Sequence, residues 1–259
     1  MDDTNLSQHA AINRQHWNDR AHEWVPSGED SWARATPKWG AWELPDAGIE
    51  LLPDDMTGMR AIELGCGTGY VSAWMARRGA EVVGIDVSDE QLATARRLAA
   101  EHDVALTLVH GTAEHVDEPD ASFDFAVSEY GAALWCDPYV WVPEAARLLK
   151  PGARLSMLTN HPLLTLCYPP NGADADEHLH RPYFGLHRLD WSEVEIDPGG
   201  VEFNLPISEW LRLFDDAGFD LDEFLELRAP DHIDDDRYAM TASWAKQWPS
   251  ELAFKLTRR

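Results

Sequence analysis

Ala61-Ile62-Glu63-Leu64-Gly65-Cys66-Gly67-Thr68-Gly69 is the stretch of this 259-residue chain that decides its fold. A short apolar run leads directly into three glycines, and helical spacing of apolar residues follows from Tyr70. Glycine lets the backbone turn tightly, and it lets a ligand approach main-chain amides that a Cβ atom would cover. The stretch therefore predicts a first strand, a ligand-binding turn and a helix in immediate succession.

The same alternation of strand and helix continues along the chain. Ser88 and Gln91 have the spacing of a helix-capping pair, and Ser208 is expected to cap a later helix. Gly79 and Pro151-Gly152 are expected to end two other helices. The expected strands are 61–64, 81–86, 105–109, 123–128, 154–158, 221–227 and 251–256. This pattern predicts an α/β fold with a doubly wound, mostly parallel sheet and helices on both faces.

Asp86, at the end of the second expected strand, indicates which ligand the glycine turn receives. A carboxylate at that position can accept two hydrogen bonds from a ribose diol. The glycines are spaced G-x-G-x-G, whereas the dinucleotide fingerprint is G-x-G-x-x-G. Glu63, beside the turn, would repel a pyrophosphate but suits a ligand with an ammonium group. These features favour S-adenosylmethionine (SAM), which carries an adenosine and an ammonium group but no phosphate, over NAD.

Five segments, in the expected order, resemble motifs of the class I (Rossmann-like) SAM-dependent methyltransferases. They are residues 63–69, 84–88, 111–114, 123–128 and 148–152. The resemblance extends over about residues 60–159. It implies a seven-stranded sheet whose last strand is antiparallel, with SAM as cofactor across the carboxyl ends of the first two strands.

The resemblance also implies roles for individual positions. The glycines would contact the methionine part of SAM through their backbone, and Glu63 would hold its ammonium group directly or through water. Asp86 would bind the ribose hydroxyls. Ala113 and Glu114 would flank the adenine, and Ser128 would close the methionine side. The full set implied for cofactor binding is Glu63, Gly65, Cys66, Gly67, Gly69, Asp86, Val87, Thr112, Ala113, Glu114 and Ser128.

Residues for catalysis and acceptor binding are expected beyond the fourth and fifth strands and in the terminal segments. Methyl transfer from a sulfonium needs mainly alignment and exclusion of water, and it needs a base only if the attacking atom must lose a proton. His161 is the candidate catalytic residue, with a turn histidine before Pro162 as the alternative. The candidates for the acceptor site are Trp24, Glu129, Tyr130 and Trp135. The acceptor is expected to be a small molecule, methylated on oxygen, nitrogen or carbon.

The chain divides into four segments. Residues 1–55 are expected to form a helical N-terminal lid, and they hold five of the twelve tryptophans. Residues 56–160 form the SAM-binding core, residues 161–206 a substrate-side insertion, and residues 207–259 the completion of the core sheet. The tryptophans of the first segment could cover the pocket with their ring faces, which attract a sulfonium, or simply pack its helices against the core.

The net charge of −25 argues against a nucleic-acid or membrane-surface partner, because such a field repels phosphate backbones and anionic lipid. The three cysteines are at unrelated spacings and fit a reducing compartment. The polar, acidic first residues are unlike a secretory signal. A cytoplasmic location follows as the expectation, with no prediction of oligomeric state.

Acidic residues and histidines gather in the insertion, but we expect no metal site there. They are Asp174, Asp176, His178, His180 and His187. Zinc or iron would need at least a third ligand from this loop, and a solvated surface loop explains the residues as well. Two other functions stay open from the sequence: a SAM-binding protein without methyl transfer, and a nucleotide-dependent oxidoreductase.

Overall fold

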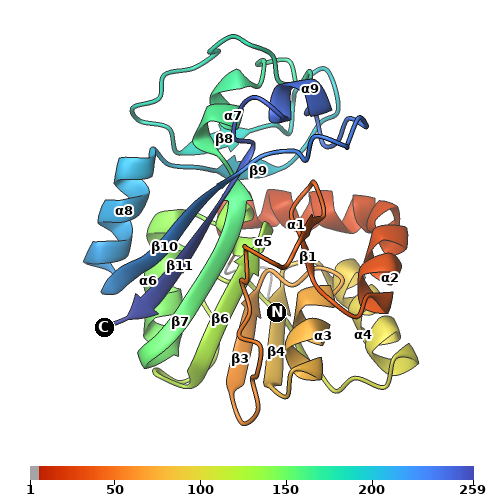
Figure 1. The fold of residues 1–259 in the computed structure, drawn as a ribbon, viewed down its shortest axis with the longest axis vertical. Helices are drawn as coiled ribbons and strands as arrows, with labels where there is room; N and C mark the ends of the chain where they lie inside the picture. Colours follow the sequence, from red (N-terminus) through yellow and green to blue (C-terminus); the bar gives the residue numbers. More distant parts are fainter. Residues whose placement is uncertain (1–5) are drawn as a thin grey trace.

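The structure is a computed structural model that describes residues 6–259, and its centre is a seven-stranded sheet (Figure 1). The strand order across the sheet is β10-β11-β7-β6-β3-β4-β5. Five strands are parallel neighbours, and β11 is antiparallel to both β7 and β10. Their bounds are β3 Arg60–Leu64, β4 Glu81–Asp86, β5 Thr107–His110, β6 Phe123–Glu129, β7 Leu149–Asn160, β10 Phe219–Leu227 and β11 Glu251–Arg258. The predicted doubly wound sheet with an antiparallel last strand is confirmed.

Helices cover both faces of this sheet, because alternate residues of each strand point to opposite sides. Ile62 of β3 packs in a core with Trp141 and Trp210, whereas its neighbour Ala61 packs in a second core with Trp74. The helices around the sheet are α3 Tyr70–Arg77, α4 Asp89–Glu101, α5 Gly131–Trp135, α6 Pro138–Leu148 and α8 Ile207–Asp216. Both cores extend across the parallel strands, and this packing holds the strand ends in position.

Two helix boundaries differ from the sequence-based prediction. Helix α6 ends at Leu148, and Pro151-Gly152 lie within β7, where the pairing with β6 shifts register. The proline and glycine therefore form an irregularity in the strand rather than the stop of the helix. Ser208 does not cap α8: Pro206 is the residue at the cap, and no side chain caps this helix. Ser88, in contrast, accepts a hydrogen bond from the Gln91 amide as predicted.

The N-terminal segment crosses the edge of the sheet where the parallel strands end (Figure 1). Its elements are α1 Gln8–Arg20, the 3-10 helix η2 Ala21–Trp24, α2 Val25–Ala33, and the short strands β1 Lys38–Trp39 and β2 Leu44–Pro45. Trp32, Trp39 and Trp42 are fully buried, and each donates its indole N–H to an oxygen of the protein. These three tryptophans pack the segment onto the core. Residues 1–5 of the expected lid lie outside the described residues.

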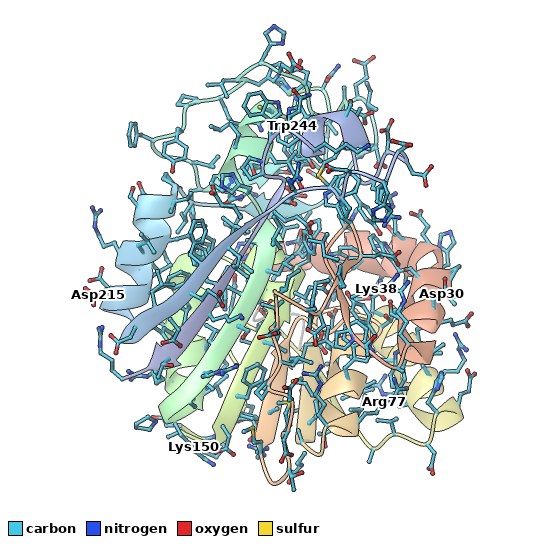
Figure 2. The ribbon with its side chains drawn as sticks, viewed as in Figure 1. Asp30, Lys38, Arg77, Lys150, Asp215 and Trp244 are labelled. Carbon is cyan, nitrogen blue, oxygen red and sulfur yellow. The ribbon has the colours of Figure 1, made fainter. Side chains whose placement is uncertain are left out.

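A cap lies above the same edge of the sheet, opposite the edge that carries Lys150 (Figure 2). It consists of α7 Pro162–Cys167, β8 Arg188–Asp190, β9 Val201–Phe203 and α9 Ala242–Ala245. Trp244 of α9 packs with Leu164 and Cys167 of α7, so the insertion and the loop between β10 and β11 share one small core. No local pattern in the sequence indicates that residues 228–248 join the insertion. Among residues 6–259, no helix has the length and apolar character to cross a membrane.

Candidate active site

A cavity of about 510 Å³ lies between the carboxyl ends of the parallel strands, the N-terminal helices and the cap. The glycine turn after β3 lines its floor with Gly65, Cys66 and Gly67. Residues from α1, η2, the cap and the loop before α9 line its other sides. Lys38 and Asp30, both lining residues, lie on the N-terminal side, below the part of the cap that carries Trp244 (Figure 2). This volume falls in the range of small-ligand sites.

The glycine turn has the conformation and the free space that a ligand-binding turn requires. Gly65, Gly67 and Gly69 all have positive φ angles, of 80°, 49° and 76°. A Cβ atom at Gly67 would meet no protein atom within 4 Å, because that position faces the cavity. A Cβ at Gly65 would lie 2.5 Å from the Gly131 Cα. Gly69 begins α3 and is not among the residues that line the cavity.

Asp86 is held at the cavity by two backbone amides. Its Oδ2 accepts a hydrogen bond of 2.7 Å from the Gly67 amide, and its Oδ1 accepts one of 2.8 Å from the Ser88 amide. A carboxylate oxygen can accept more than one hydrogen bond, so both oxygens keep acceptor capacity toward the cavity. Burial raises the pKa of Asp86, although these amides oppose the shift. The arrangement suits a pair of neighbouring hydroxyl groups.

Glu63 lies beneath the turn and is almost completely buried. Its Oε2 accepts hydrogen bonds from the backbone amide and the hydroxyl of Ser72, at 2.7 and 2.5 Å. Burial raises the pKa of Glu63 to about 8, and nearby Glu129 and Asp86 add to the rise. A cation placed in this part of the cavity would favour the ionised carboxylate. The site therefore suits a ligand with a positive charge.

The remaining positions implied for the cofactor divide into two groups. Val87, Thr112 and Ala113 line the cavity beside Asp86. Glu114 is not a lining residue, because its Oε1 is bound to the His9 ring and to the Asp137 amide. Ser128 is also directed elsewhere: its hydroxyl donates to the Leu64 carbonyl and accepts from the Ala133 amide. These two contacts join β6, α5 and the end of β3 just below the site.

All four residues expected at the acceptor site line the cavity. They are Trp24, Glu129, Tyr130 and Trp135. Glu129 accepts the Gly40 amide with Oε1 and the Tyr70 hydroxyl with Oε2, and burial raises its pKa. Tyr130 has a positive φ of 56°, which a bulky residue rarely adopts.

The structure places His161 outside the cavity. Its Nδ1 accepts the Leu163 amide at the start of α7, and its Nε2 lies 3.0 Å from the Glu226 Oε1. Burial lowers its pKa, and Glu226 opposes that shift. His161 thus has the contacts of the turn histidine before Pro162. Sequence position alone suggested the other role, because the histidine follows the end of a parallel strand.

The acidic residues and histidines of the insertion are separated by the fold. His180 contacts Asp176 at 2.9 Å, whereas His187 contacts Asp137 at 3.0 Å, far along the chain. In the described part of the chain, no three His, Cys, Asp or Glu side chains gather as a metal site would require.

Several residues that sequence reasoning missed are prominent at the site. Glu251 of β11 is completely buried, and its Oε1 accepts the Ala41 amide and the Tyr130 hydroxyl, at 2.8 and 2.5 Å. Glu202 of β9 and Tyr238 line the cavity from the cap side. Glu251 and Glu202 lie in strands whose neighbouring residues have no unusual pattern, so the local sequence does not indicate that these two carboxylates belong to the site. Gly131 could have been noticed, because it is a glycine two residues after the end of β6.

Comparisons with known proteins agree with this geometry. A family described as "Methyltransferase domain" matches residues 62–157. A ubiquinone biosynthesis O-methyltransferase of Sinorhizobium medicae is 30% identical over 168 residues, which cover 60% of this chain and 68% of that protein. An uncharacterised methyltransferase of Mycobacterium bovis is 40% identical over 116 residues, 45% of each chain. The fold is shared with a SAM-dependent methyltransferase crystal structure from Mesorhizobium loti, with a TM-score of 0.65, 24% identity and coverage of 82% of this chain and 96% of that one.

The matched segment contains the glycine turn, Asp86 and the fourth strand, which are the parts that form the floor of the cavity. The resemblance on which the nucleotide choice depends is therefore confirmed, and the oxidoreductase alternative is not supported. The chain belongs to the class I SAM-dependent methyltransferases: it is an enzyme, and SAM is its cofactor.

Proposed function

We propose that this enzyme transfers the methyl group of SAM to a small molecule that binds in the same cavity. One observation carries the proposal: a single cavity is lined by Gly67 and Asp86 and also by Trp17, Trp24 and Trp135. A cofactor bound on the floor would therefore face an aromatic chamber. The N-terminal segment, described from residue 6 to 55, and the insertion (161–206) would serve as lid and cap over the two ligands.

The residues on the floor fit the parts of SAM. Asp86 would accept hydrogen bonds from the ribose hydroxyls, and Val87, Thr112 and Ala113 would surround the adenine. The backbone of Gly65 and Gly67 would lie against the methionine part. Glu63 would favour its ammonium group from below, through a water molecule, because the Glu63 Oε2 is bound to Ser72. Glu114 and Ser128 would act indirectly, by holding the loops in place.

A basic cluster supports binding of the carboxylate of the amino-acid tail. Arg34, Lys38 and Arg237 all surround the single carboxylate of Glu43, and all four residues line the cavity. Three positive charges against one leave a local excess of positive charge in a strongly acidic protein. The cluster lies beside Gly40, whose amide is bound to Glu129 at the end of β6.

Methyl transfer requires mainly that the protein hold the acceptor and SAM in the correct relative position. Bound SAM supplies an electrophilic methyl group on a sulfonium whose sulfur is a good leaving group. The lid and cap would exclude water and hold the acceptor in line with that methyl group. Glu129 ends β6 and Tyr130 follows it, at the junction of floor and chamber, so these are the side chains that we expect closest to the transfer.

The relatives include O-methyltransferases of ubiquinone biosynthesis, which makes oxygen one candidate for the methylated atom. However, the family match ends at residue 157. Trp191, Glu202 and Tyr238, which line the cavity from the cap, lie beyond it. The choice of acceptor therefore depends on the residues of this chain's own cap.

The test combines cofactor binding with turnover. We expect calorimetry to show SAM binding to the purified protein, and mass spectrometry to show S-adenosylhomocysteine when phenols, carboxylic acids or amines are supplied as acceptors. Gly67→Val should abolish both, because its side chain would enter the space against which SAM lies. SAM binding without S-adenosylhomocysteine from any acceptor would instead support a SAM-binding protein without methyl transfer.

A further inference from the structure

The acceptor side of the cavity is walled by aromatic rings from four parts of the chain. The Trp17 ring contacts those of Trp24 and Trp135 edge-on, with centroids 5.4 and 5.0 Å apart. The Trp24 ring stacks in parallel on Tyr238 at 5.6 Å, which joins the N-terminal segment to the loop before α9. Trp191 of the cap lines another side. Rings arranged in this way form an aromatic chamber that suits an apolar or aromatic body.

Glu202 adds a carboxylate to this chamber. It lines the cavity from β9, and its Oε2 accepts a hydrogen bond of 3.1 Å from the Trp191 indole N–H. The nearest positive charge belongs to Arg181, but that guanidinium stacks on the Trp191 ring and donates to the carbonyls of Thr165 and Tyr168. In the described part of the chain, no cation forms a salt bridge with Glu202. Burial raises its pKa to about 7, although Arg181 opposes the shift.

The charges that line the cavity are unbalanced in favour of carboxylates. The acidic lining residues are Asp30, Glu43, Glu63, Asp86, Glu129, Asp197 and Glu202. The basic ones are Arg20, Arg34, Lys38 and Arg237. Arg20 is already bound to Glu23 and Asp197, and the other three surround Glu43. Among the described residues that line the cavity, an anionic acceptor would therefore meet no unpaired cation beside Glu202, and that carboxylate would repel it.

We propose that the acceptor is an amine with an aromatic or apolar body, whose ammonium group is bound by Glu202 among the rings of the chamber. The inference rests on the proposed methyltransferase function. Aromatic faces attract cations, and the ionised form of a partly buried carboxylate without a salt-bridge partner is stabilised when a cation arrives.

The same carboxylate accounts for the proton that the reaction releases. Only the free amine is a nucleophile, so the bound ammonium must first lose a proton, and Glu202 accepts it. The nitrogen then forms a bond to the methyl carbon while the sulfur–carbon bond of the cofactor breaks. The electron pair of that bond stays on sulfur, which becomes a neutral thioether, and the product is the N-methylated ammonium.

The proposal is tested with three probes of one shape: phenethylamine, 2-phenylethanol and 3-phenylpropionate. Binding is followed by the fluorescence of the chamber tryptophans, at saturating SAM and without it. We expect the amine to bind most tightly, the alcohol more weakly and the acid least. Glu202→Gln should weaken binding of the amine by about 10- to 100-fold, the cost of losing a charged hydrogen-bond partner, and leave the alcohol unchanged.

Glu195→Gln is the matched control, because Glu195 is exposed on the same segment and does not line the cavity. It should behave as the wild type with all three probes. The proposal is overturned if the alcohol or the acid binds as tightly as the amine, if none of the probes binds, or if Glu202→Gln keeps the preference for the amine. Two measurements on the same samples separate the amine proposal from the proposed function. If mass spectrometry finds S-adenosylhomocysteine from phenols but not from amines, the amine is rejected and the methyltransferase is kept. If calorimetry finds no SAM binding, the proposed function is rejected.

Discussion

At Asp86, one side chain both holds the glycine turn and lines the cavity. Because its oxygens already hold the amides of Gly67 and Ser88, the ribose of SAM would complete an existing arrangement. We expect Asp86→Ala to weaken SAM binding by about 1.5–3 kcal/mol, the range for hydrogen bonds to a charged group. Calorimetry gives the affinity, and circular dichroism confirms that the variant is folded. An unchanged affinity in a folded variant would remove Asp86 from the cofactor site.

Glu251 makes stability depend on pH in a direction opposite to that of most paired carboxylates. Its Oε2 has no hydrogen-bond partner among residues 6–259, and burial raises its pKa from the ordinary 4.5 to about 7. Between these two pKa values, the folded state therefore binds more protons than the unfolded state. The stabilising contribution of Glu251 to the free energy of unfolding is then lost as pH rises from about 4.5 to 7.

The matched variant is Glu251→Gln, whose side-chain oxygen can still accept from Ala41 and Tyr130. We expect the wild type to lose on the order of 3 kcal/mol of unfolding free energy relative to this variant between pH 5 and pH 8. Urea unfolding of both proteins across this range measures the difference. A difference that stays constant, or that grows in favour of the wild type, would show that Glu251 is already ionised at acidic pH.

At the scale of elements, the turns after β3 and β6 touch through a pair of glycines. A Cβ atom at Gly131 would lie 2.3 Å from the Gly65 carbonyl oxygen and 2.4 Å from that of Leu64. Both obstacles are backbone, so a side chain cannot be accommodated by a rotamer change. We expect Gly131→Ala to cost about 1–3 kcal/mol of stability and to weaken SAM binding, because the two turns must separate.

Gly58→Ala is the control for this change. It adds the same methyl group at a position where no protein atom lies within 4 Å, although φ is positive there. It should cost about 1–2 kcal/mol through backbone strain and leave SAM affinity as in the wild type. Thermal unfolding and calorimetry of the two variants separate strain from collision. Equal SAM affinity in both would mean that the contact between the turns does not shape the cofactor site.

For the whole molecule, the cavity is formed by segments that are distant in sequence. Trp17 comes from α1, Gly67 from the core and Tyr238 from the loop before α9. A ligand that contacts all three parts should stabilise them as one unit. At a concentration of 100 times its dissociation constant, SAM should add about 2.7 kcal/mol, which raises the melting temperature by about 5–10 °C. NAD at the same concentration should leave the melting temperature unchanged; protection by NAD but not by SAM would contradict the cofactor assignment.

Much of the fold was predictable from the sequence because its signals are local. The run from Ala61 to Gly69, the capping pair of Ser88 and Gln91, and the alternation of apolar residues depend only on neighbours along the chain. The errors were also local: Pro151-Gly152 and Ser208 have the residue types of a helix stop and a cap, but strand pairing and Pro206 took those roles. The candidate catalytic residue His161 lies outside the cavity, whereas the acceptor candidates, Trp24 and Tyr130 among them, line it.

The sequence by itself determined the sheet, the glycine turn and the carboxylate at the end of β4. Each of these depends on consecutive residues that have a fixed conformational preference. Only the tertiary structure decided that Glu202 and Tyr238 meet Trp17 across one cavity, and that Glu251 is buried with no cation among residues 6–259 acting on it. Burial, proximity and the resulting pKa values arise from contacts between residues far apart in the chain. No pattern of neighbouring residues encodes such contacts, and they exist only once the sheet brings its strand ends to a common edge.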